Sequence, residues 1–143
     1  LTPSENTDLA AAAKVSLFWK LLGSKLVFTD PKRHDELAAL LSHVPHMTAV
    51  SLIQLIADSK EDPHLLSCLA GNGLRDTTRV AMGSSQMWLE IAQQNREEIA
   101  NLLDEMAGEL NLFADLLRNQ EFEELENRLV ASAQFRKKLE KKG

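Results

Sequence analysis

The chain has 143 residues, of which 44% are hydrophobic and 26% charged, enough for one globular domain with a sizeable core. A net charge of -5 excludes a general nucleic-acid binder, which needs a basic face. The single cysteine, Cys68, cannot form an internal disulfide and fits a reducing compartment. With no signal peptide and no apolar run that would span a bilayer, we expect a cytoplasmic protein without nucleic-acid or membrane partners.

The first 32 residues predict one helix followed by one short strand. Apolar residues at helical spacing predict a helix over 9–22, with Thr7 or Asp8 as its N-cap. Residues 25–29 form a strand candidate that ends at Asp30-Pro31. Because a lone strand has unpaired edges, we expect residues 1–32 to be the last α/β unit of a larger, Rossmann-type sheet.

Residues 33–143 predict a mainly α, helical bundle-like domain, because they are rich in Leu, Ala and Glu and poor in β-branched runs. Pro45 should kink or break the first helix, since proline lacks a backbone donor and its ring crowds the preceding turn. The expected helices cover 31–58 with that kink, 64–70, a segment from about 75 to 82, 86–117, and a last one from about 122 to 139.

Two histidines and a serine flank Pro45 in the segment Ser42-His43-Val44-Pro45-His46. On a helix His43 and His46 share one face, and a break there suits the wall of a cleft. A metal site would need further ligands, and none stands out nearby. A serine beside a histidine in sequence is no nucleophile–base pair. The simpler alternative is a kinked core helix with structural histidines.

A second polar motif, Gly71-Asn72-Gly73-Leu74-Arg75-Asp76-Thr77-Thr78-Arg79, precedes Trp88 by nine residues. Arg79 offers a planar fork of donors that binds carboxylates in a bidentate way. Asp76 lies three residues earlier and could hold Arg79 in position. The alternative is a surface ion pair of little energetic weight.

Together these two motifs resemble the C-terminal domain of prephenate and arogenate dehydrogenases, NAD(P)-dependent enzymes of tyrosine biosynthesis. The likeness covers nearly the whole chain, including Leu1-Thr2-Pro3 and residues 31–35. It implies a helical domain of the 6-phosphogluconate-dehydrogenase C-terminal type that binds substrate and forms a homodimer. The substrate-binding residues that it implies are Ser42, His43, His46, Gly73, Asp76, Arg79 and Trp88.

The resemblance also implies what these 143 residues lack. In the family the general base is a histidine of the nucleotide-binding domain, which holds NAD or NADP on a Gly-rich turn. No strand–GxGxxG–helix pattern occurs in the sequence. We therefore expect no catalytic residue here, no metal, and no dehydrogenase activity from this polypeptide alone.

Some alternatives stay open at this level. The chain could be a non-catalytic helical dimerisation module, or part of a related two-domain hydroxy-acid dehydrogenase. The sequence does not decide between prephenate and arogenate, between NAD and NADP, or whether tyrosine inhibits. Dimerisation is also favoured by an apolar seam with helical spacing: Ile99, Leu102, Met106, Leu110, Phe113 and Leu117.

Overall fold

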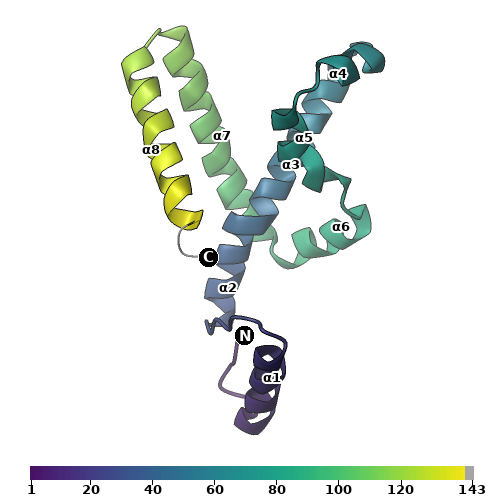
Figure 1. Cartoon of the computed structure of the whole chain (residues 1–143), viewed down its shortest axis with the longest axis vertical. Helices are drawn as coiled ribbons and strands as arrows, with labels where there is room; N and C mark the ends of the chain where they lie inside the picture. Colours follow the sequence, from purple (N-terminus) through teal and green to yellow (C-terminus); the bar gives the residue numbers. More distant parts are fainter. Residues whose placement is uncertain (141–143) are drawn as a thin grey trace. The chain divides into compact units, whose positions relative to one another are not determined.

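The computed structural model describes residues 1–140, and helices dominate them, which confirms the expectation of a mainly α fold (Figure 1). The elements in chain order are α1 (Leu9–Leu21), α2 (Pro31–Ala38), the π-helical turn η1 (Ala39–His43), α3 (Val44–Asp58), α4 (Pro63–Leu69), α5 (Asn72–Thr78), the 3-10 turn η2 (Arg79–Met82), α6 (Ser85–Gln94), α7 (Arg96–Arg118) and α8 (Phe122–Glu140).

The N-terminal segment contains the expected helix without the expected strand. Asp8 caps α1 by accepting hydrogen bonds from the amides of Ala10 and Ala11. Residues 25–29 are not a strand. Among residues 1–140 their backbone pairs only with Leu1, which donates to Val27 O over 2.8 Å and accepts from Thr29 N over 3.1 Å. The strand prediction was wrong because a ladder needs a neighbouring strand of several residues, and one residue does not supply it. The expected domain boundary between residues 32 and 33 stays a prediction.

Helix α2 runs through η1 into α3 without ending at Pro45, so of the kink or break expected there the structure has no break. Instead, the amide of Val44 donates to Ala39 O, five residues back, and opens the turn just before Pro45. Proline lacks the next amide, and its ring would crowd the carbonyl four residues earlier. A π-turn relieves both problems while the chain stays helical.

The same run, Pro31–Asp58, is long and apolar enough to cross a membrane by length and composition alone, which the sequence analysis did not expect. A core helix of a soluble protein satisfies the same criterion. The apolar residues of this run that are buried, Ala39, Val44 and Ala49, are buried against other parts of the chain.

By contacts, the chain divides into one unit over residues 1–102 and a second unit from Leu103 onward. In the first, α3 packs against α5 and η2. Thr78 is buried there at the end of α5, and its hydroxyl donates to Leu74 O over 2.7 Å. This packing positions the polar residues described below.

The second unit is a hairpin formed by the C-terminal part of α7 and α8 (Figure 1). The turn closes with a hydrogen bond from Glu121 N to Leu116 O over 2.9 Å. Leu116 is only 4% exposed, and Arg128 of α8 pairs with Glu109 of α7 at 3.3 Å.

The single long helix expected over 86–117 is in fact two helices with Asn95 between them. Asn95 has φ -120° and ψ 32°, outside the helical region, while its carbonyl still accepts from Ile99 N over 3.1 Å. Asparagine favours such a break because its side chain can hydrogen-bond backbone groups and so compete with the hydrogen bonds of the helix. In this chain the Asn95 amide donates to the backbone carbonyl of Asp35.

Large apolar side chains remain exposed along α7 and α8 in the described part of the chain. They include Leu110, Leu117, Phe122, Leu129, Val130, Phe135 and Leu139, each about half exposed or more. Many exposed large apolar side chains on two neighbouring helices are typical of a region that another protein surface covers.

Candidate functional site

His46 of α3 and Trp88 of α6 form the centre of the candidate site. Their rings stack with centroids 3.5 Å apart and planes 7° apart. His46 is 5% exposed, and its Nδ1 has no hydrogen-bond partner among the described residues. A buried polar atom without a partner costs free energy, so this nitrogen is a candidate for contact with a ligand.

Gly83 allows Trp88 to lie close to the backbone. A Cβ added at Gly83 would lie 2.7 Å from Trp88 Nε1 and 3.3 Å from Val80 O. Only glycine leaves that space free. Nothing in the sequence itself indicates which side chain approaches Gly83, so this requirement was missed.

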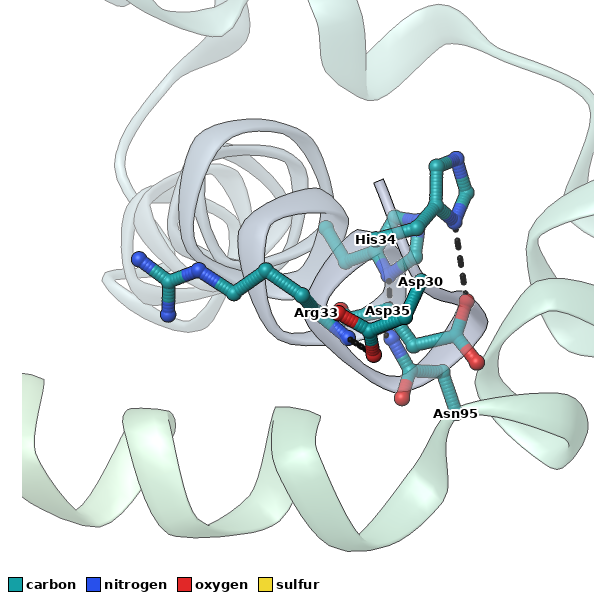
Figure 2. A network of polar contacts seen from close by, with 6 residues as sticks. Asp30, Arg33, His34, Asp35 and Asn95 are labelled. Carbon is teal, nitrogen blue, oxygen red and sulfur yellow. Dashed lines mark hydrogen bonds and ion pairs between the residues drawn. The ribbon is translucent and has the colours of Figure 1, made fainter. Parts of the chain in front are cut away.

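His43 also contacts the ring of Trp88. Its ring meets that of Trp88 edge-on, with centroids 6.1 Å apart and planes 84° apart. Asn95 Nδ2 lies 3.4 Å from His43 Nδ1 and donates to Asp35 O over 2.8 Å. Figure 2 shows Asn95 next to Asp35, with His34 on the far side of that residue. Asn95 was missed in the sequence because it lies in what reads as a long helix.

A cavity of about 340 Å³ opens beside His43. His34 and Asp35, whose Nδ1 and Oδ1 atoms lie 2.9 Å apart, supply part of its lining. The lining residues are His34, Asp35, Ala38, His43, Ile91, Gln94 and Asn95.

Both histidines have a lowered pKa. The largest effect on the pKa of His43 is burial, which lowers it; the charge of Asp35 raises this pKa, and that of His34 lowers it. Burial also lowers the pKa of His46, while a polar contact with the backbone of Val80 raises it. Both imidazoles are therefore neutral at neutral pH, and each offers one donor and one acceptor.

The structure brings three of the predicted site residues together: His43, His46 and Trp88. Ser42 lies in η1 and is exposed, as are Gly73 and Asp76 in α5. Arg79 opens η2, is exposed, and directly precedes Val80, the residue whose backbone contacts His46.

No ion pair joins Asp76 to Arg79 in the described part of the chain, so Asp76 does not hold the guanidinium as suggested from spacing. Three-residue spacing on a helix does not bring them together here, because α5 ends at Thr78 and Arg79 begins a 3-10 turn. Within residues 1–140 no cluster of three or more His, Cys, Asp or Glu side chains could hold a metal ion.

Fold and site together define a helical domain that holds two neutral histidines against one tryptophan, with a polar cavity beside one of them. Residues 30–131 match the family described as "Prephenate dehydrogenase, dimerization domain". The chain belongs to this family, which confirms the resemblance inferred from the two motifs.

Relatives with known names agree. The chain is 30% identical to prephenate dehydrogenase of Bacillus subtilis, over 87% of this chain and 34% of that protein. It is 28% identical to cyclohexadienyl dehydrogenase of Zymomonas mobilis, over 85% of this chain and 42% of that protein. The chain thus spans less than half the length of these relatives.

Solved structures give the same result. Arogenate dehydrogenase from Synechocystis superposes with a TM-score of 0.80 and 31% identity, covering 96% of this chain and 50% of that one. Prephenate dehydrogenase from A. aeolicus, in complex with hydroxyphenyl propionate and NAD+, superposes with a TM-score of 0.87 and 27% identity. That match covers 96% of this chain and 48% of the A. aeolicus chain.

Proposed function

We propose that this chain is the substrate-binding and dimerising part of a prephenate or arogenate dehydrogenase. The reaction would be the oxidative decarboxylation of prephenate to 4-hydroxyphenylpyruvate, or of arogenate to tyrosine. The observation that carries the proposal is the buried imidazole of His46, which stacks on Trp88 and whose Nδ1 has no partner within residues 1–140. The chain belongs to the prephenate dehydrogenase dimerisation-domain family, which gives that free nitrogen a substrate to meet.

The contact that each residue would make with the substrate follows from the chemistry of its side chain. Neutral His43 and His46 would donate to or accept from the oxygens of the substrate, and Ser42 would add a hydroxyl. Arg79, exposed and always charged, would bind a carboxylate with its two parallel donors. Gly73, Asp76 and Trp88, the other residues of the predicted site, would line the same pocket.

NAD or NADP, when bound, supplies the hydride acceptor. The 143 residues contain no strand–GxGxxG–helix segment to cradle its pyrophosphate. We therefore propose that residues outside this sequence hold it. The chain alone should reduce no nicotinamide when given prephenate or arogenate; clear turnover in that assay would refute this part of the proposal.

Substrate binding can be tested at Arg79. Ligand-observed NMR with prephenate and with arogenate should detect binding to the chain. Arg79→Ala should weaken it roughly tenfold or more, the loss expected for one charge-assisted hydrogen bond. Arg75→Ala removes another exposed arginine of the same segment and should bind as the unaltered chain does. Equal binding by the two variants would contradict the role of Arg79.

We also propose a homodimer, because the exposed apolar side chains of α7 and α8 need cover and the matched family is a dimerisation domain. Sedimentation should give twice the monomer mass at micromolar concentration. Phe135→Glu, which puts a charge on that surface, should shift the equilibrium to monomer. Gln134→Glu, the matched control next to it, should not. We expect the protein in the cytoplasm, as its single cysteine suits a reducing compartment.

A further inference from the structure

Asn95 makes two contacts through one atom. Its Nδ2 lies 2.8 Å from the carbonyl oxygen of Asp35 and 3.4 Å from Nδ1 of His43. A backbone carbonyl only accepts hydrogen bonds, so the atom facing it must be the amide nitrogen and not the amide oxygen. The first contact therefore fixes which way the Asn95 amide is turned.

The orientation of this amide has a consequence for His43. An NH2 group carries two protons and accepts none. One proton is used on Asp35 O, and the other is available for His43 Nδ1, which must then be the unprotonated nitrogen of the neutral ring. The ring proton is left on Nε2, because the two nitrogens of a neutral imidazole take opposite roles.

We infer that Asn95 is a positioning residue that holds His43 in its Nε2-protonated form, so that Nε2 is the donor offered to an anionic substrate. The inference deepens the proposed function and rests on it for the substrate. The position of the proton on the His43 ring is inferred from the two Asn95 contacts alone, without the proposed function. The lowered pKa of His43 is consistent with it, since a neutral ring is needed for a tautomer to exist.

The backbone supports the same role. Asn95 interrupts the helix between α6 and α7, which frees its side chain to turn toward the carbonyl of Asp35. Helix α6 also contains Trp88, which meets the His43 ring edge-on. Asn95 therefore fixes the imidazole that the tryptophan contacts, and it does so at the wall of the 340 Å³ cavity.

The test is the protonation pattern of the His43 nitrogens, read by long-range ¹H–¹⁵N NMR on the labelled chain near neutral pH. His43→Gln identifies its signals among the four histidines. We expect the proton on Nε2. In Asn95→Asp a carboxylate faces Nδ1 and should draw a proton onto it. Asn95→Ala should leave a mixture of tautomers, and Gln93→Ala, an exposed residue of α6 outside the cavity lining, should match the unaltered chain.

A proton on Nδ1 in the unaltered chain overturns the inference without any variant. So does an unchanged pattern in a folded Asn95→Asp chain, or in folded Asn95→Ala if the aspartate variant does not fold. Prephenate binding is measured in parallel and should weaken about tenfold in Asn95→Asp but not in Gln93→Ala. If Nε2 is protonated as expected while no chain binds prephenate, the tautomer assignment stands and the proposed function fails.

Discussion

Replacing Gly83 by alanine should destabilise the protein by displacing Trp88 from His46. The new Cβ would lie 2.7 Å from Trp88 Nε1, and ordinary contacts begin at 3.4 Å, so the ring would have to move by about 0.7 Å. The ring has little room, because His46 is stacked against it at a centroid distance of 3.5 Å. Overpacking of this kind costs about 1–3 kcal/mol.

The assay is urea denaturation together with tryptophan fluorescence in a Trp19→Phe background, where Trp88 is the only emitter. Gly83→Ala should lower the unfolding free energy and change the emission of Trp88. Gly108→Ala is the matched control: it lies in α7 with no atom within 4 Å of the added Cβ. It should stabilise by roughly 0.5–1 kcal/mol. A Gly83→Ala protein of undiminished stability with unchanged emission would refute the close packing.

Three further outcomes are expected. In the folded chain the pKa of His46 lies below its ordinary value of 6.5, so near and below that pH the unfolded chain binds more protons than the folded one. The urea concentration at the unfolding midpoint should therefore fall as the pH drops from about 7.5 to about 5.5. The fall should be less steep in His46→Gln. Leu116→Ala should cost about 2–4 kcal/mol in thermal unfolding, whereas Leu55→Ala, at an exposed position of α3, should change stability by less than about 1 kcal/mol. Asp8→Ala should cost about 1 kcal/mol and reduce helical circular dichroism, by removing the cap of α1.

The sequence alone predicted the family, the helical fold and the residues around the stacked rings. Helical spacing and caps are local signals, so Asp8 and the last helix were found within a residue or two. The motif around Pro45 identified His43 and His46 because buried polar groups in an apolar run need a reason to be there.

What the sequence could not predict depends on contacts between distant segments. Asn95 is 60 residues from Asp35, and no local pattern indicates that its amide reaches that carbonyl. The requirement for glycine at position 83 likewise appears only once Trp88 lies against it. Residues 25–29 have the composition of a strand, but whether a strand forms depends on neighbouring backbone that the described residues do not offer.

The π-turn at 39–43 holds one residue more than a regular helix would hold between the same flanks. Each residue of a helix advances its angular phase by about 100°. Placed in a regular helix, the extra residue would rotate Asp35, before it, by about a quarter-turn relative to His46, after it. The wide turn takes up that residue and leaves the two flanks in phase. Relatives that keep the same pair of imidazoles should therefore tolerate the loss of one residue at this turn better than a loss elsewhere between the two flanks.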